Sequence, residues 1–275
     1  MKKDPASVEI IIVGNELLNG TTLDTNSQWL SKRLQSLGAS VTRKTTVRDN
    51  LQEISQAFQS AMKRSPAWIF SVGGLGPTFD DMTLRGLAIS LRRKICRNLT
   101  AVQMIRKSRE ERIHSGTRIS RSLLPATLKM AEMPVGAVPL VNTVGTAPGV
   151  LVKVRFTRIV SLPGVPKEVK AIFLQEVRPL LRMAPMGTKR EEKWLHAEGI
   201  SESSIAPKIS KLMRKYAPSI YIKSHPIGFR KGVSILKFQL SIEGGSQKNE
   251  KILDLATNEL ISESKKMGAK VRMQS

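Results

Sequence analysis

Residues 67–83 read AWIFSVGGLGPTFDDMT, and this stretch decides the fold of the first two thirds of the chain. Its first six residues form a mainly apolar run, which is typical of a parallel strand buried on both faces. Gly73, Gly74 and Gly76 follow the run directly, and Asp80 and Asp81 come shortly after them. Glycines at the end of a buried strand allow a sharp turn and bring backbone N–H groups close to a ligand. The stretch therefore predicts a strand that ends in a phosphate-binding loop.

The residues before this stretch alternate between strand-like and helix-like patterns. Residues 8–13 form an apolar run, 26–38 have the spacing of an amphipathic helix, 39–47 can return as a strand, and 49–64 form a second helix. Such alternation indicates βαβ units and a parallel sheet. Ligands bind outside the carboxyl ends of parallel strands. We therefore expect residues 14–16, Asp49 and the glycine loop to lie at the same edge of the sheet.

The second half of the chain divides at a breaker-rich segment, residues 183–188. Before it we expect strands over 150–154 and 157–162 and a helix from 164 toward 181. After it the order is strand, helix, strand, strand, helix, strand, with helices over 201–216 and 247–265 and strands near Leu195, Tyr221, Leu236 and Val271. The pattern predicts two domains, 1–182 and 189–275, the second a small α+β fold whose helices cover one face of a mostly antiparallel sheet.

Composition sets limits on the class of protein. The 275 residues carry a formal net charge of +23, so attraction to polyanions is expected. The basic residues are spread along the chain and no recognised nucleic-acid motif is present, so specific nucleic-acid binding is not predicted. A single cysteine, Cys96, excludes an intramolecular disulfide. No apolar run reaches the roughly 18–20 residues that span a bilayer, and we expect a cytoplasmic protein without a membrane partner.

The two aspartates after the glycine loop are candidates for metal binding. Mg²⁺ is often held by one or two carboxylates together with substrate phosphate oxygens, so Asp80 and Asp81 could place such an ion beside the phosphate loop. A simpler interpretation is that one of them caps the helix that begins near Thr83. Asp49, Asp24 and Asn26 have the same ambiguity, because each also stands where a helix N-cap is expected.

Other loops supply further candidates. Asn15 and Glu16 follow the first strand, while Gly145 with Thr146 and Gly164 with Pro166 lie in tight turns that expose the backbone. Taken singly, each turn is also explained by structure alone. The three histidines are far apart and lack metal-ligand spacing. No Gly-x-Ser-x-Gly sequence is present, so acyl-transfer hydrolysis is not supported.

In combination and in order, these motifs resemble the CinA (competence/damage-inducible) family, in a short form without the deamidase domain. The first region is similar to the MoaB/Mog molybdopterin-binding domain, and the second more weakly to a KH-type module that lacks a Gly-x-x-Gly loop. The motifs that carry the resemblance are residues 14–18, 24–26, 73–83, 129–131, 145–149 and 162–168, with 198–206 and 222–226 in the second region. Departures include Asn15 where bacterial members have threonine and Val72 where they have glycine.

The resemblance implies a three-layer αβα domain with a mostly parallel sheet. It also implies metal-dependent hydrolysis of a nucleotide pyrophosphate such as ADP-ribose, with Mg²⁺, Mn²⁺ or Co²⁺ as cofactor, and a tendency to form homo-oligomers. The glycine loop would hold phosphate, Asp81 would place the metal, and Asp49 would assist. The residues expected to bind phosphate or substrate are Gly73, Gly74, Gly76, Thr78, Asn15, Gly145, Thr146, Gly164 and Pro166.

The mechanism that we expect is metal-assisted attack of water on the pyrophosphate, with Asp81, Asp49 and Asp80 as metal ligands. Glu16 would orient or deprotonate the water. Two alternatives stay open. The crevice could bind a pterin phosphate or transfer adenylate to it, or the basic stretch from Arg106 to Arg121 could make the chain a non-catalytic polyanion-binding protein.

Overall fold

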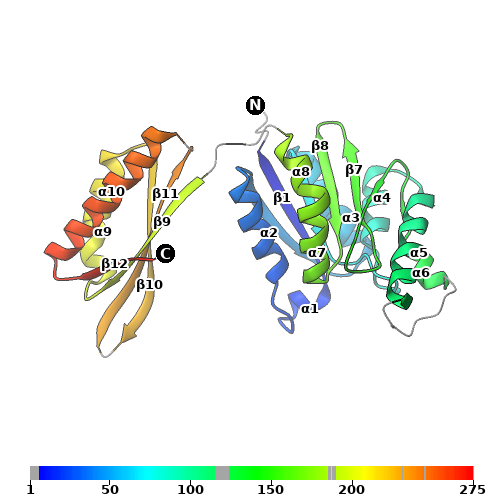
Figure 1. Cartoon of the computed structure of the whole chain (residues 1–275), viewed down its shortest axis with the longest axis horizontal. Helices are drawn as coiled ribbons and strands as arrows, with labels where there is room; N and C mark the ends of the chain where they lie inside the picture. Colours follow the sequence, from blue (N-terminus) through cyan, green and yellow to red (C-terminus); the bar gives the residue numbers. More distant parts are fainter. Residues whose placement is uncertain are drawn as a thin grey trace. The chain divides into compact units, whose positions relative to one another are not determined.

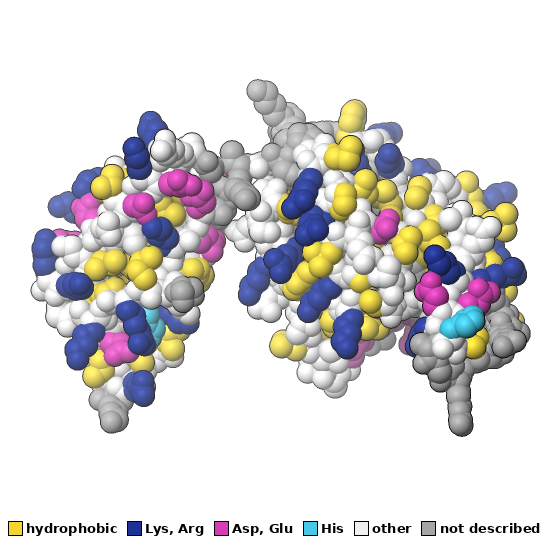
Figure 2. All heavy atoms as spheres, in the orientation of Figure 1, with side chains coloured by type: hydrophobic (Ala, Val, Ile, Leu, Met, Phe, Trp, Pro, Cys, Tyr) yellow, Lys and Arg dark blue, Asp and Glu magenta, His cyan; other side chains and the backbone are white. Residues whose placement is uncertain are grey.

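The computed structural model describes residues 6–114, 124–184, 187, 190–230, 232–244 and 246–274. They belong to two compact units, Met1–Gly187 and Thr188–Ser275. Figure 2 shows lysine and arginine side chains spread over the visible surface of both units. Within the described residues, no helix is long and apolar enough to cross a membrane.

The first unit is built on a six-stranded sheet with the order β2-β1-β3-β8-β7-β6. Four neighbouring strands, β2, β1, β3 and β8, are parallel, whereas β7 runs antiparallel to both of its neighbours, β8 and β6. This confirms the prediction of a mostly parallel sheet. The strands span Ser7–Val13 (β1), Ser40–Val47 (β2), Trp68–Val72 (β3), Val138–Leu140 (β6), Gly149–Val154 (β7) and Thr157–Leu162 (β8). A separate pair, Ile95–Arg97 (β4) and Glu132–Pro134 (β5), forms a small second sheet.

Helices cover both faces of the large sheet, which gives the expected three layers (Figure 1). Alternate residues of β1 show why, since side chains alternate along a strand. Ile10 and Ile12 pack into the core formed with α2 and α7, whereas Ile11 and Val13 pack into the core formed with α3, α4 and α5. The helices of this unit span Asn15–Leu18 (α1), Thr25–Ser36 (α2), Leu51–Arg64 (α3), Thr83–Leu91 (α4), Leu99–His114 (α5), Pro125–Lys129 (α6), Pro166–Ile172 (α7) and Arg178–Arg182 (α8).

The helix starts correct two expectations about caps. The N-cap of α3 is Asn50, whose side chain accepts the N–H groups of Gln52 and Glu53, so Asp49 does not cap this helix. The N-cap of α4 is Met82, without a side-chain hydrogen bond, so neither Asp80 nor Asp81 caps α4. The structure therefore excludes the simple capping explanation for these three aspartates.

Other expected elements are observed with small differences. Asp24 caps α2 by accepting the N–H of Ser27 at 2.9 Å. The helix expected from 164 toward 181 is α7 continued through a π-helical turn, Phe173–Val177, into α8. In the basic stretch, α5 carries Arg109 and Arg112, while Arg118 and Arg121 lie outside the described residues.

The second unit follows the predicted order of strand, helix, strand, strand, helix, strand. Its elements are Arg190–Glu198 (β9), Glu202–Lys215 (α9), Ile220–Arg230 (β10), Val233–Glu243 (β11), Gln247–Lys266 (α10) and Lys270–Gln274 (β12). The antiparallel sheet has the order β10-β11-β9-β12, which is the split βαβ arrangement. The helices α9 and α10 lie on one face of this sheet (Figure 1), and their apolar side chains pack against it.

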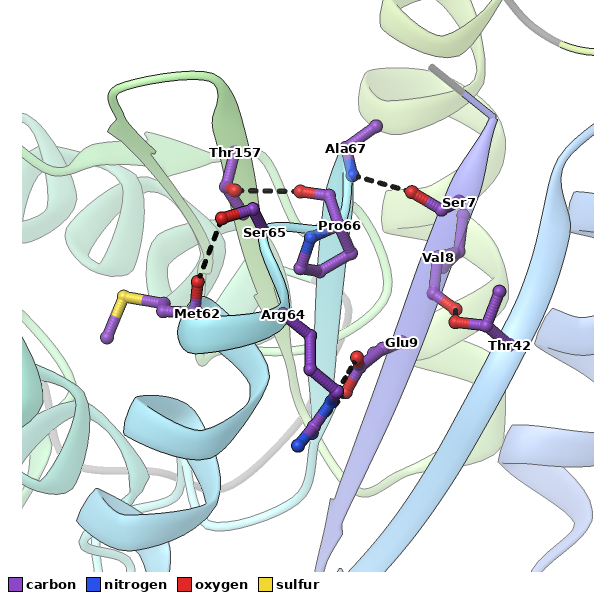
Figure 3. Close-up of polar contacts among 10 residues, drawn as sticks. All are labelled: Ser7, Val8, Glu9, Thr42, Met62, Arg64, Ser65, Pro66, Ala67 and Thr157. Carbon is purple, nitrogen blue, oxygen red and sulfur yellow. Dashed lines mark hydrogen bonds and ion pairs between the residues drawn. The ribbon is translucent and has the colours of Figure 1, made fainter. Parts of the chain in front are cut away.

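A buried ion pair joins β1 to the end of α3. Glu9 is 3% exposed, and both of its carboxylate oxygens accept hydrogen bonds of 2.7 Å from the guanidinium of Arg64 (Figure 3). Glu9 lies on β1, between β2 and β3, and its side chain is 4% exposed, whereas that of Arg64 is 39% exposed. The pair therefore fixes the C-terminal turn of α3 against β1.

We predict that Arg64→Ala lowers the free energy of unfolding by about 2–3 kcal/mol, because it leaves the Glu9 carboxylate buried without its partner. Urea unfolding followed by circular dichroism measures this change. The matched control is Lys63→Ala, which removes an exposed cation from the same helical turn and should change stability by less than about 0.5 kcal/mol. Equal effects of the two substitutions would contradict the prediction.

Candidate functional site

A cavity of about 790 Å³ opens at the carboxyl edge of the parallel strands. The loops that follow β1, β2, β3 and β8 line it. The loop before β7 also reaches it, because β7 is antiparallel to β8 and therefore begins at the edge where the parallel strands end. The site thus stands where ligands bind in open α/β sheets.

The glycine loop is held so closely against its neighbours that side chains are excluded. Gly73 has a φ of +100°, and a Cβ there would lie 2.2 Å from the carbonyl oxygen of Val13. Gly74 has a φ of +67°, and a Cβ there would lie 2.3 Å from the hydroxyl of Thr83. That hydroxyl donates a 2.8 Å hydrogen bond to the Gly73 carbonyl. The C-terminal ends of β1 and β3 and the N-terminal end of α4 therefore meet at these two glycines.

Asp81 shapes the second half of the loop. Its Oδ2 accepts hydrogen bonds from the backbone N–H of Thr78 at 2.9 Å and from the Thr78 hydroxyl at 2.6 Å. A Cβ on Gly76 would lie 2.5 Å from the same oxygen. Asp80 also accepts a hydrogen bond from the Thr78 hydroxyl, and Lys129 donates to the Thr78 carbonyl. Asp81 is thus part of the loop's own framework as well as part of the cavity wall.

Four acidic side chains gather at this part of the cavity. Burial raises the pKa of Asp49, and the charges of Glu16, Asp80 and Asp81 raise it further. A 2.8 Å hydrogen bond from the N–H of Asn15 lowers the pKa of Asp49. Glu16 folds back over the end of β1, since a Cβ on Gly14 would lie 2.5 Å from its carboxylate. The repulsion among these groups makes the site favourable for a cation.

Within the described ranges, no three His, Cys, Asp or Glu side chains are placed to hold one ion. The expected set of metal ligands, Asp81, Asp80 and Asp49, stays a prediction.

Two arginines of α5 also line the cavity. Arg109 and Arg112 line the cavity, and Arg112 donates a 3.1 Å hydrogen bond to the hydroxyl of Thr146. Glu168, in the first turn of α7, also lines the cavity. Burial raises the pKa of its carboxyl group. A 2.9 Å hydrogen bond from Asn142 and the charge of Arg112 both lower that pKa.

The structure brings together most of the residues selected from the sequence. Those that line the cavity are Glu16, Asp49, Gly73, Gly74, Gly76, Thr78, Asp80, Asp81, Thr146, Gly164 and Pro166. Asn15 and Gly145 do not line it. The Asn15 N–H instead binds Asp49, and Gly145 leaves room for Glu168, whose carboxylate would lie 2.2 Å from a Cβ at that position.

Sequence reasoning did not select Arg109, Arg112 or Glu168 for this site. The signal available for the arginines was their spacing, because residues three apart share one face of a helix. Asn26 has a positioning contact as well, since its side-chain amide donates a 2.7 Å hydrogen bond to the Gly164 carbonyl. The contact ties the start of α2 to the loop after β8.

Comparisons with known proteins agree with this architecture. Residues 9–183 match the family described as "Probable molybdopterin binding domain". A protein from Sulfurisphaera tokodaii is 37% identical over 263 residues, covering 96% of this chain and 95% of its own length. One from Pyrobaculum arsenaticum is 42% identical over 238 residues, covering 86% of each chain. The solved structure of CinA from Thermoplasma acidophilum, described as of unknown function, is 36% identical, with a TM-score of 0.56, and covers 64% of this chain and 98% of that one.

The sheet with helices on both faces and the loop-lined cavity define a MoaB/Mog-like α/β domain. The chain belongs to the family of probable molybdopterin-binding domains, and the expected resemblance to CinA is confirmed by the Thermoplasma structure.

Gly73 should be far less tolerant of substitution than another glycine with a positive φ. Gly20 has a φ of +78° with nothing within 4 Å of its Cβ position, whereas a Cβ at 73 meets a backbone carbonyl. We expect Gly20→Ala to cost about 1 kcal/mol from backbone strain alone. Gly73→Ala should cost at least twice as much, as measured by urea unfolding, because β1 and β3 must separate. A similar loss in both variants would contradict this account of the loop.

Asp49→Asn should raise the thermal unfolding midpoint at pH 7. The pKa of Asp49 is higher in the folded state than in the unfolded state, so ionisation of Asp49 destabilises the fold. This destabilisation is absent below the unfolded pKa and is complete once the pH has risen through the folded pKa. Asparagine can still accept the Asn15 N–H but carries no charge. The gain should disappear below the unfolded pKa of an aspartate, where both states are protonated. Calorimetry at pH 7 and pH 3 compares the two conditions, and a variant less stable than the parent at pH 7 would sink the prediction.

Proposed function

We propose that the cavity binds a phosphorylated nucleotide and that the protein hydrolyses its pyrophosphate bond with the help of a divalent metal ion, with ADP-ribose as the representative substrate. The observation that carries the proposal is the division of the cavity lining into three parts. Glycine-rich backbone lies at the strand ends, four carboxylates lie beside it, and two arginines lie on α5. A pyrophosphate with a bound cation complements all three.

The glycine loop and the arginines would hold the phosphates. The tight turn at Gly73 and Gly74 places backbone close to the cavity and leads to the N-terminal end of α4 at Thr83, where the helix dipole favours negative charge. Arg112 is already oriented by Thr146 and would supply planar, charged donors to phosphate oxygens. The N-terminal end of α4 and the arginines of α5 would therefore both offset the negative charge of the phosphates.

The carboxylates fit a metal that is shared with the substrate. Mg²⁺ commonly takes one or two carboxylates and completes its shell with water and phosphate oxygens. Asp81 would contribute the oxygen that does not bind Thr78, and Asp49 would contribute a carboxylate whose ionisation a neighbouring cation would favour. When bound, the ion would neutralise phosphate charge and lower the pKa of a bound water.

Glu16 would act on the attacking water. Its carboxylate lies over the end of β1 and lines the same cavity as Asp49 and Asp81. A carboxylate in this position would orient the water or accept its proton. Lys129 binds the Thr78 carbonyl and would keep the loop in place during the reaction.

A second candidate function is binding of molybdopterin, or transfer of adenylate to it. The family description of residues 9–183 favours it, and the same glycine loop would hold the pterin phosphate. The two functions differ in chemistry. Hydrolysis of ADP-ribose needs only a metal and water, whereas adenylyl transfer needs molybdopterin and ATP together.

Asp81→Asn should abolish metal-dependent turnover and leave the fold intact, since the asparagine oxygen can still accept the Thr78 N–H. The measurement is release of AMP from ADP-ribose with Mg²⁺, Mn²⁺ or Co²⁺, next to a thermal melt. Asp254→Asn, in the second unit, is the matched control and should retain full activity.

The same purified protein, incubated with molybdopterin and ATP, tests the alternative. AMP release from ADP-ribose that depends on metal and on Asp81 supports the hydrolase proposal. Full activity in Asp81→Asn, or product only in the molybdopterin reaction, refutes it.

A further inference from the structure

The sheet of the second unit has two unlike faces. Leu195, Phe238 and Ile222 point to the face covered by α9 and α10. The alternate residues of each strand point to the opposite face, where Tyr221, Lys223 and Arg272 are exposed. The hydrogen-bonded register shows which side chains are neighbours there, because directly paired residues lie on the same side of a sheet.

One row of this open face is basic across all four strands. His225 pairs with Lys237, Lys237 with His196, and His196 with Arg272. At about 4.8 Å between strands, the row is roughly 14 Å wide. Lys237 and Arg272 are the permanent cations of this row, and His196 lies between them on β9. The row therefore places two cations on the open face with a histidine beside each of them.

The next row along the strands is aromatic and polar. Trp194 pairs with Gln239, which pairs with Lys223. The rings of Trp194 and His225 lie 5.4 Å apart between centroids and are inclined by 31°, so the two rings contact each other across β11. Tyr221 adds a further exposed ring on β10, 48% accessible. Stacking surfaces and cations are thus interleaved on the open face.

Alternation along β9 and β11 also places Glu192, Glu198 and Glu243 on this face. Glu198 is partly neutralised, because its Oε1 lies 3.7 Å from a ring nitrogen of His196 and 3.7 Å from a guanidinium nitrogen of Arg272. The whole unit carries 17 lysines and arginines against nine aspartates and glutamates. Figure 2 shows lysine and arginine side chains around a histidine on this unit. The face is therefore complementary to an anionic ligand with planar groups.

We propose that the open face of the β10-β11-β9-β12 sheet binds single-stranded RNA. Unstacked bases would lie on Trp194, His225 and Tyr221, and the phosphates would lie against Lys223, Lys237 and Arg272. One common RNA-binding module stacks unpaired bases on aromatic rings of a four-stranded sheet, and duplexes do not expose the faces of their bases for such stacking. Gln239 and Gln274 supply hydrogen-bonding groups beside the rings, within reach of base edges and 2′-hydroxyls. This site involves no residue of the cavity in the first unit.

The test is fluorescence anisotropy of the full-length chain with a labelled 12-nucleotide oligouridylate. Trp194→Ala should weaken binding by about 5- to 150-fold, the range for loss of one stacked base. Lys237→Gln with Arg272→Gln should lower the slope of log affinity against log salt by about 1.4, the value for two lost phosphate contacts on a single strand. The matched control is Lys211→Gln with Lys251→Gln, which removes the same charge from exposed positions on α9 and α10 and should leave the slope within about 0.3 of the parent's.

Trp194→Phe gives a readout that does not depend on folding of the alanine variant. Of the three tryptophans, Trp68 is fully buried in the first unit and Trp29 packs on Phe173 there. RNA should therefore quench Trp194 emission in the parent, and Trp194→Phe should lose the quench while keeping most of the affinity. Equal affinity for duplex RNA or for oligothymidylate, equal losses in the two double variants, or an unchanged quench in Trp194→Phe would overturn the proposal.

Discussion

The close approach of β1 to β3 at their carboxyl ends is the constraint on which the cavity depends. At that point the Val13 carbonyl occupies the space that a side chain at residue 73 would need. The chain can leave β3 only through backbone conformations that glycine tolerates. Because Thr83 then binds the Gly73 carbonyl, the start of α4 is fixed as well. One steric contact thus positions the loop, the helix start and the aspartates between them.

The aspartates illustrate how far the sequence alone could lead. Asp49 and Asn50 are adjacent, and both residue types are good N-caps. Periodicity located the helix but did not distinguish between them. In the structure Asn50 takes the cap, and the Asp49 carboxylate instead receives the N–H of Asn15 from the neighbouring strand end. That contact joins residues 34 positions apart, and nothing local in the sequence specifies it.

Strands and helices were predictable because burial imposes a period on the sequence. The glycine loop was predictable because several glycines directly after a buried strand indicate a sharp turn that exposes the backbone. The arginines of α5 were visible only as a basic helix, since their place at the cavity depends on how α5 packs against the sheet. The same is true of the open face in the second unit. Its aromatic and basic residues come from four separate strands, and only the pairing register places His225, Lys237, His196 and Arg272 in one row.

Charge connects these observations. In a chain of net charge +23, a cluster of four carboxylates at the proposed site is a local exception. The overall positive field attracts phosphorylated ligands, yet the cluster would repel a bare phosphate at short range. Burial raises the pKa of Asp49, and the charges of the neighbouring carboxylates raise it further. In the proposed function, a phosphate that arrives with a divalent cation would satisfy both the arginines of α5 and the carboxylates. The proposal therefore implies a preference for a metal-complexed pyrophosphate over a phosphate without metal.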